Sequence, residues 1–237
     1  CVNWYVENSE VQDETFGSAL YPTPGCEERH TFAESPVRGM LEHNGRCFVV
    51  VGQTFYEIYS DATILPVFRG TVAHDLVPAT LVANDMGDEI FITSAGVGYI
   101  FTLSTQAFAT VLASGADQGE FLDGFFLSLN ASTSTLSLSD LNDGLTWDVT
   151  QYAQRTAGAD PWQAVVVTHR DIWLFGKQTT EVWYNAGTSP FPFAAIPGAF
   201  LEQGIAAPYS AKRLGNTIIW LGSSEEGAGV VWMASGY

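Results

Sequence analysis

The residues of this sequence that could do chemistry are its carboxylates, histidines and serines, and their spacing matches no common catalytic arrangement. Glycoside hydrolysis needs two carboxylates that face one another. With 26 Asp and Glu residues such a pair could arise anywhere, so their number carries no information. A serine nucleophile on a strand-to-helix elbow needs the pattern G-x-S-x-G, which the chain lacks. The sequence therefore predicts no catalytic residue.

Metal and cofactor sites are not predicted either. Zinc sites use His and Cys ligands at short spacings, whereas the four histidines have no partner at i+2 or i+4. These are His30, His43, His74 and His169. Gly96-Val97-Gly98 lacks the third glycine of a dinucleotide-binding fingerprint, and no P-loop is present. We expect no metal ligand, no cofactor-binding residue and no cofactor.

Residues 139–147, SDLNDGLTW, come near the Asp box of sialidase-type propellers, S-x-D-x-G-x-x-W. The spacing differs, because Asp143 and Gly144 are adjacent here. An Asp box is itself a turn device, so we interpret this stretch as a tight turn held by an Asp side chain. It is not a calcium loop, since Gly144 falls where a ligand is needed and no Glu closes the loop.

Carbohydrate chemistry stays open as an alternative. Sialidases bind the sugar carboxylate with clustered arginines, but the seven arginines here are spread over positions 29, 38, 46, 69, 155, 170 and 213. Several aromatic residues could stack on sugars, although they fall on predicted strands, where core packing is the expected role. These are Trp173, Trp183, Tyr184, Trp220 and Trp232. A sialidase-like glycan-processing or glycan-binding propeller is therefore the alternative function.

Composition limits the partners and the fold class. The 237 residues are 46% apolar and only 15% charged, which favours a large core over disorder. The formal net charge is −17, so a surface that grips nucleic acid through Lys and Arg is not expected. We interpret Cys1, Cys26 and Cys47 as reduced, because three cysteines cannot all pair and none lies in a C-x-x-C motif. No signal peptide and no membrane-spanning apolar run is present.

The element that positions most of these residues is a strand pair, clearest in residues 169–187, HRDIWLFGKQTTEVWYNAG. Residues 172–175 and 180–184 read as strands and residues 176–179 as a polar turn. Ile172 and Leu174 should face one side and Trp173 and Phe175 the other, because side chains alternate along a strand. Both faces are apolar, so we expect the sheet to be covered on both sides.

Similar strand pairs recur along the chain. They are predicted at 47–51 with 54–59, 90–93 with 98–102, 125–129 with 133–139, and 217–221 with 230–233. Further strand-like pieces lie between them, at 64–69, 79–82, 107–112, 147–149 and 164–168. Four strands in about 40–50 residues is the spacing of a β-propeller blade. We therefore predict an all-β propeller with about five blade-like units, the alternative being a β-sandwich.

The predicted organisation has two parts. Residues 1–43 form an N-terminal strand and loop segment, and residues 44–237 form the blades. The fifth unit stops after its second strand, so closure of the ring needs residues beyond Tyr237 or the N-terminal strand. Both ends are expected to be cut from a longer polypeptide.

Several stretches give the chain a specific family resemblance. They are FLDGFF at 121–126, SDLNDGLTWD at 139–148, the segment 169–187, Pro192-Phe193, residues 206–208, and LGSSEEGAGVVWMASGY at 221–237, together with VNWYVE near the start and Arg38-Gly39-Met40. With these the chain resembles the packaged-DNA stabilisation proteins of short-tailed bacteriophages, also called tail hubs or head-closure plugs. Family members are roughly twice this length, so the resemblance is to their N-terminal half.

The resemblance implies a non-enzymatic structural protein of the virion tail, made in the host bacterial cytoplasm. Copies would form a ring, expected to be a hexamer, below the portal and its adaptor protein. That ring would close the DNA channel, retain packaged DNA and anchor the tail needle or tailspikes. DNA would pass without sequence-specific binding, and no membrane is involved. Our hypothesis is that acidic runs such as Glu225-Glu226 or residues 85–89 face the channel and repel DNA phosphates.

Overall fold

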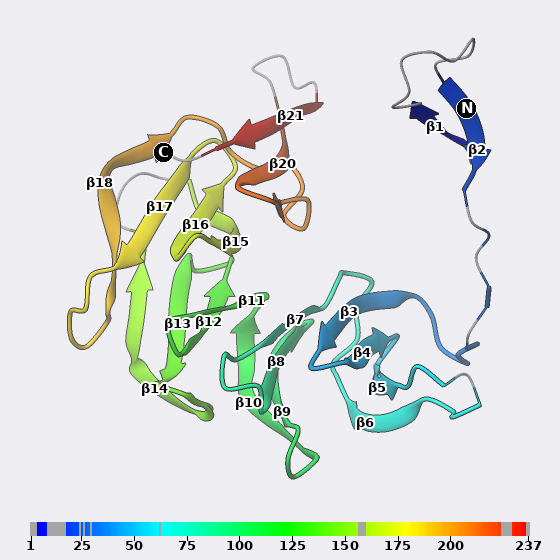
Figure 1. Ribbon diagram of the computed structural model, residues 1–237. Coiled ribbons are helices and arrows are strands. Elements are labelled where there is room, and N and C mark those ends of the chain that lie inside the picture. The colour runs from blue at the N-terminus through cyan, green and yellow to red at the C-terminus, as the bar shows by residue number, and fades with distance from the viewer. Residues whose placement is uncertain are drawn as a thin grey trace. The chain divides into compact units, whose positions relative to one another are not determined.

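The computed structural model describes residues 4–8, 18–23, 25, 27–28, 30–61, 63–155, 160–223 and 229–235. All regular secondary structure in these residues is β-strand (Figure 1). A search of the same residues finds no helix with the length and hydropathy needed to span a membrane. The chain divides into two compact units, Cys1–Thr31 and Phe32–Tyr237.

The first unit contains a single two-stranded hairpin. Strands β1 (Trp4–Asn8) and β2 (Ser18–Pro22) are antiparallel. The Tyr5 and Tyr21 rings, on opposite strands of the pair, stack with their centroids 5.9 Å apart. Cross-strand aromatic pairs of this kind stabilise two-stranded sheets.

The second unit contains five antiparallel sheets in chain order, which are the blades of a β-propeller (Figure 1). Blade 1 consists of β3 (Val37–His43), β4 (Arg46–Val51), β5 (Thr54–Ile58) and β6 (Val67–Thr71). Blade 2 consists of β7 (Thr80–Ala83), β8 (Glu89–Ser94), β9 (Gly96–Thr102) and β10 (Ala107–Ala116). Blade 3 consists of β11 (Gln118–Leu122), β12 (Phe125–Asn130), β13 (Thr135–Asp140) and β14 (Asp143–Gln154). Blade 4 consists of β15 (Trp162–Thr168), β16 (Asp171–Gly176), β17 (Thr180–Asn185) and β18 (Phe193–Leu201), and blade 5 of β19 (Lys212–Leu214), β20 (Thr217–Ser223) and β21 (Gly229–Ala234).

This arrangement confirms the predicted propeller and excludes the β-sandwich. Each predicted strand pair is present, including the hairpin of β16 and β17. The blades begin earlier than residue 44, where the sequence analysis placed their start, because β3 pairs with β4 as the first strand of blade 1. The alternation of apolar residues does not predict β3, because only three of its residues, Val37, Met40 and Leu41, are apolar side chains.

The first strands of the five blades lie side by side and form the inner wall of the propeller. Strand β3 contacts β7, β7 contacts β11, β11 contacts β15, and β15 contacts β19. Hydrogen bonds cross from blade to blade along this wall. The Ala79 amide donates to the Arg38 carbonyl at 3.0 Å, and the Gly119 amide donates to Thr80 Oγ1 at 2.8 Å. These bonds satisfy backbone groups that a solitary sheet would leave unpaired.

Each gap between neighbouring blades holds its own apolar cluster. On β16, Ile172 and Leu174 belong to the cluster between blades 3 and 4, and Trp173 and Phe175 belong to the cluster between blades 4 and 5. The predicted alternation is therefore confirmed. Burying a large apolar side chain contributes about 1.5–3 kcal/mol, so both faces of every inner blade add to the cohesion of the propeller.

Candidate functional site

The histidines, cysteines and arginines weighed in the sequence analysis do not gather into one site among the described residues. Among the described residues no group of three or more His, Cys, Asp and Glu side chains could hold a metal ion. His43 contacts the adjacent Asn44, and His169 contacts Thr168 and Asn216. Cys47 is a free thiol whose pKa is raised by burial. Cys1, Cys26 and Arg29 lie outside the described residues.

The stretch that resembles an Asp box is a turn between β13 and β14. Asn142 has a left-handed backbone (φ 57°), and its amide donates to the Gly124 carbonyl at 2.7 Å. The Asp143 carboxylate accepts bonds from the Leu145 amide and the Thr146 hydroxyl, both at 2.9 Å. The tight turn is therefore present at residues 141–142, while the Asp143 side chain holds the start of β14 that follows it. The arrangement offers backbone geometry rather than a reactive group.

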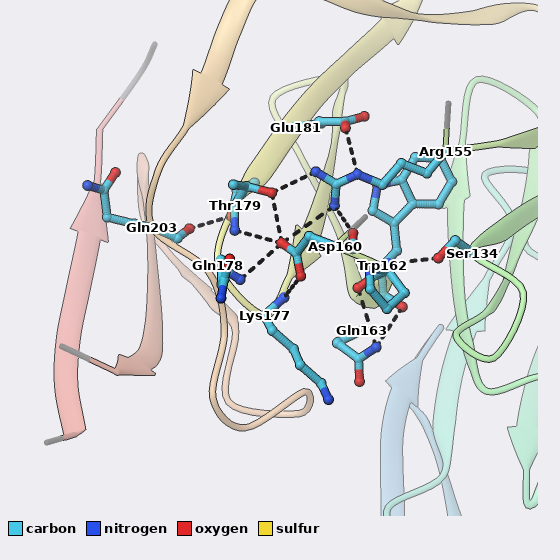
Figure 2. A network of polar contacts seen from close by, with 12 residues as sticks. Ser134, Arg155, Asp160, Trp162, Gln163, Lys177, Gln178, Thr179, Glu181 and Gln203 are labelled. Carbon is cyan, nitrogen blue, oxygen red and sulfur yellow. Dashed lines mark hydrogen bonds and ion pairs between the residues drawn. The ribbon is translucent and has the colours of Figure 1, made fainter. Parts of the chain in front are cut away.

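The turn 176–179 between β16 and β17 is held by Asp160 (Figure 2). The Asp160 carboxylate accepts hydrogen bonds from the amides of Lys177, Gln178 and Thr179 at 2.8, 3.0 and 2.9 Å. The Thr179 hydroxyl adds a fourth bond at 2.8 Å. Burial by itself opposes ionisation, but these hydrogen bonds outweigh it and lower the pKa of Asp160.

Arg155 joins this turn to the neighbouring strand. Its guanidinium lies 3.0 Å from Glu181 and 3.7 Å from Asp160, and it donates to Thr179 Oγ1 at 2.6 Å (Figure 2). The Arg155 side chain is only 3% exposed. A buried charge needs partners on every side, and here one cation is compensated by two carboxylates. The turn and Glu181 belong to the stretch 169–187 that carries the family resemblance, and Arg155 and Asp160 fix this hairpin from outside it.

A second buried cluster fixes the outer half of blade 1. Glu57 on β5 is 1% exposed and accepts hydrogen bonds from Arg46 on β4 and Arg69 on β6 at 2.6–2.9 Å. Burial opposes its ionisation, yet the bonds from the two arginines lower the pKa of Glu57. The two cations also lie over aromatic rings, Arg46 over Phe48 and Arg69 over Phe101. Three strands of the blade are thereby tied by one carboxylate.

The inner wall carries a third polar cluster, and sequence patterns predict neither this cluster nor the two above. Gln118 on β11 accepts a hydrogen bond from the Val165 amide at 2.9 Å and donates to the Pro208 carbonyl at 3.1 Å. Tyr209 donates through its hydroxyl to the Asp117 carbonyl at 3.3 Å, and burial raises the pKa of Tyr209 to about 12. The connection between blades 4 and 5 thus crosses to blade 3 at the propeller axis.

Glu120 lies beside this connection, in an axial cavity of about 170 Å³ shared with Lys212. Burial raises the pKa of Glu120 to about 8, although Lys212 and the Val167 amide favour the ionised form. No local pattern marks this carboxyl, because the residues that line the cavity belong to blades 2, 3, 4 and 5.

The aromatic residues divide between core and surface. Trp173 and Trp220 are each 3% exposed, and Trp183 and Trp232 pack against the interblade clusters. Their predicted core role is confirmed. The prediction is wrong for Tyr184, which is 41% exposed at the last position but one of β17.

The acidic run at residues 85–89 is only partly exposed. Glu89 is buried, so its carboxylate does not reach the surface. It accepts hydrogen bonds from the Asn84 amide group at 3.2 Å and the Gly144 amide at 3.0 Å. Burial raises the pKa of Glu89. Asp85 is exposed, and so it is the member of the run 85–89 that remains open to a partner. Glu225 and Glu226 lie outside the described residues.

Comparison with known proteins gives one family. The family model described as bacteriophage P22 Gp10, β-propeller, matches residues 3–237. No curated protein matches the chain.

Solved structures share the fold at low sequence identity. PorZ, a surface component of the type-IX secretion system of Porphyromonas gingivalis, has a TM-score of 0.52 and 12% identity over 86% of this chain and 27% of that chain. A functionally unknown protein from Desulfotomaculum acetoxidans has a TM-score of 0.55 and 10% identity over 85% of this chain and 70% of that chain. A chain of the S. cerevisiae complex of Dbp5 with Nup159 and Gle1 has a TM-score of 0.50 and 10% identity over 87% of this chain and 63% of that chain. This chain spans 27% of the PorZ chain, and identities this low show the fold alone.

Proposed function

Because the chain belongs to the bacteriophage P22 Gp10 β-propeller family and is a structural protein of a bacteriophage, we propose that it works in the virion tail. In this proposal, copies form a ring, expected to be sixfold, below the portal and its adaptor ring. The ring closes the DNA channel, retains packaged DNA and anchors the tail needle or tailspikes. The observation that carries the proposal is the family match over almost the whole chain.

The packing of the blades supports a load-bearing role. Each inner blade is covered on both faces by apolar clusters, and the inner wall is tied by hydrogen bonds from blade to blade. Close-packed interiors of this kind transmit strain because they have little free volume. A protein that retains DNA under pressure needs such stiffness more than it needs a mobile loop.

The axis of the propeller is not the proposed DNA channel. Gln118 bonds to the Pro208 carbonyl and Tyr209 bonds to the Asp117 carbonyl across the inner wall. These contacts occupy the space between the inner strands, and the remaining axial cavity is about 170 Å³. A duplex does not fit there, so the proposed channel is enclosed by several copies, each contributing part of its outer surface.

The charge distribution supports passage without binding. Five described arginines are engaged in ion pairs with carboxylates: Arg38, Arg46, Arg69, Arg155 and Arg170. Cations that are already paired are poorly placed to neutralise DNA phosphates. The formal net charge of −17 then disfavours DNA adhesion, and exposed acids such as Asp85 are the candidates to face the channel.

Electron microscopy of virions tests the proposal most directly. The expected result is density for the propeller in a closed ring between the adaptor and the needle, and native mass of the full-length protein should show the ring order. Density elsewhere in the virion, or a monomer under all conditions with adaptor present, would contradict it. The Asp85→Asn virion should release DNA more slowly, with Asp61→Asn, another exposed acid, as the control.

The proposed role is not enzymatic. Arg46 and Arg69 share Glu57 in blade 1, and Arg38, Arg155 and Arg170 pair with other carboxylates. Arginines already bound to carboxylates of the fold give no support to the rival glycan-processing function. Incubation of the protein with a panel of glycosides discriminates the structural role from the glycan-processing function. Turnover that is abolished by replacing a single carboxylate would favour the enzyme.

A further inference from the structure

The gap between blades 2 and 3 is the one least filled by apolar side chains. Its fully buried cluster has three members, Phe91, Ile100 and Phe126, whereas the gap between blades 1 and 2 and the gap between blades 3 and 4 have ten each. Towards the outer strands β10 and β14 the gap opens into a cavity of about 380 Å³. None of the polar clusters described above uses this cavity.

Both outer strands are irregular where they line the cavity. Strand β10 shifts its register against β9 between Thr110 and Leu112. Strand β14 shifts against β13 so that Tyr152 pairs with Ser137 and Trp147 pairs with Ser139. Residues 148–151 therefore leave the ladder. Bulges of this kind re-aim side chains and occur often beside functional sites.

The shift places two aromatic side chains on one face of blade 3. Residues that pair across strands share a face, so Tyr152 and Trp147 lie on the same side. The Trp147 indole N–H donates to the Gly144 carbonyl at 2.8 Å, and its ring packs on Phe91 at a centroid distance of 5.2 Å. Tyr152 is 47% exposed. The cavity thus has a fixed indole and an accessible phenol ring.

Polar groups stand next to the two rings. Thr135 Oγ1 accepts a hydrogen bond from the Gln154 amide group at 3.1 Å. No described residue donates a hydrogen bond to the side-chain oxygen of Gln154, which can therefore accept one from a ligand. Within the described part of the chain, neither the Ser137 hydroxyl nor the Tyr152 hydroxyl bonds to another protein group. A purely apolar occupant would leave these groups without partners at a cost in free energy.

The charge of the lining excludes another class of ligand. Among the described residues no Lys, Arg or His lines the cavity, and the one carboxyl that does is Asp148. Hydrogen bonds from the Thr150 amide and hydroxyl lower the pKa of Asp148, which is therefore anionic at neutral pH. Phosphates, carboxylates and acidic sugars are disfavoured beside this group, because like charges repel.

A ligand that suits the cavity is uncharged, has apolar C–H faces for the rings, and carries hydroxyl groups for the polar side chains. We propose that the cavity between blades 2 and 3 binds a neutral saccharide, with a sugar ring against Trp147 and Tyr152 and its hydroxyl groups on Ser137, Thr135 and Gln154. The volume suits a site for a small ligand. In the part of the chain that the structure describes, Asp148 is the only carboxylate that lines the cavity. Glycoside cleavage needs two carboxylates, so we expect the saccharide to be bound and not hydrolysed.

Saturation-transfer NMR on the purified full chain tests the site with glucose, galactose, mannose and N-acetylglucosamine, and with sialic acid as the charged comparator. At least one neutral sugar should bind saturably, and sialic acid should bind more weakly. Tyr152→Ala should weaken binding about tenfold, as expected for loss of one aromatic contact. Tyr184→Ala, which removes an aromatic side chain of similar exposure on blade 4, should leave binding unchanged.

Thermal unfolding of each variant shows whether the fold is retained, and Tyr152→Leu replaces Tyr152→Ala if the latter is unfolded. Three results would overturn the inference: no saturable binding of any neutral sugar, equal binding by the Tyr152 and Tyr184 variants, or sialic acid binding as tightly as the neutral sugars. Release of nitrophenol from nitrophenyl glycosides would overturn the conclusion that the site does not hydrolyse. The outcome is independent of ring formation.

Discussion

Asp160 should control the stability of the hairpin that the sequence marks most strongly. Its carboxylate accepts three backbone amides and one hydroxyl from the turn 176–179. Hydrogen bonds to a charged group contribute about 1.5–3 kcal/mol each but are not additive within one cluster. Asp160→Ala removes all four and leaves the Thr179 amide half-buried without its acceptor. We expect the free energy of unfolding to fall by about 3 kcal/mol.

This loss has a measurable size in a domain of this length. At about 2–4 °C per kcal/mol, the Tm should fall by about 6–12 °C. Asp160→Asn keeps one acceptor oxygen and should lose about half as much. Hydrogen exchange of the Lys177, Gln178 and Thr179 amides gives a local readout, and these amides should exchange faster in Asp160→Ala.

The dependence on pH gives a separate check. The folded-state pKa of Asp160 is lowered, so its contribution is present above the unfolded pKa, near 3.8, and is lost as the pH falls through the folded pKa. Wild-type protein should therefore lose more stability below about pH 4 than Asp160→Asn does. Asp148→Ala, which removes a comparable turn bond at the surface, is the control and should change the Tm little. Unchanged Tm and unchanged amide exchange in Asp160→Ala would refute the role of this carboxylate.

Three further predictions concern the blades and their inner wall. Glu57→Gln should lower the free energy of unfolding by about 3 kcal/mol in urea titration, because Arg46 and Arg69 lose a buried partner. A loss below about 1 kcal/mol would contradict a stabilising role of this carboxylate. Glu120→Gln should raise the Tm at pH 9 but not at pH 4. The pKa of Glu120 is raised to about 8, so ionisation of this carboxyl lowers the stability of the wild-type protein as the pH rises from about 4.5 to about 8. A Tm change that is the same at both pH values would contradict the assignment. Gly39→Ala should cost about 1–3 kcal/mol in the same titration, since the new Cβ would lie 2.6 Å from the Ala79 carbonyl oxygen, and Gly25→Ala, which meets no neighbour, is its control.

The parts of the fold that sequence could predict are those set by local periodicity. The alternation of Ile172, Trp173, Leu174 and Phe175 predicts a strand covered on both faces, and the structure shows two apolar clusters there. Strand β14 was predicted only at 147–149 but extends over Asp143–Gln154, because its polar residues and its bulge hide the period of two.

The parts that sequence could not predict depend on contacts between distant residues. Gln118 and Pro208 are bonded across 90 positions, and no local pattern records that pairing. Asp160 and Arg155 flank the undescribed residues 156–159, so their convergence on the turn 176–179 is visible only in three dimensions. Burial of Glu89 likewise depends on Gly144 from the next blade.

These contacts explain how a chain with few cations can be both compact and strongly acidic. Arg38, Arg46, Arg69 and Arg155 are placed where carboxylates are desolvated, so the positive charge is used within the fold. The remaining excess of acid is left to the surface, where solvent and salt screen it. In the proposed function, stiffness and weak DNA adhesion would have a common physical origin, because the arginines that tie the strands together are no longer available to phosphates. Glu57→Gln releases two arginines from their shared carboxylate, so it should weaken the blade and increase retention of the protein on a DNA column at low salt. Glu202→Gln is the control, because Glu202 is an exposed acid that makes no ion pair in the described residues. It should alter retention through net charge alone.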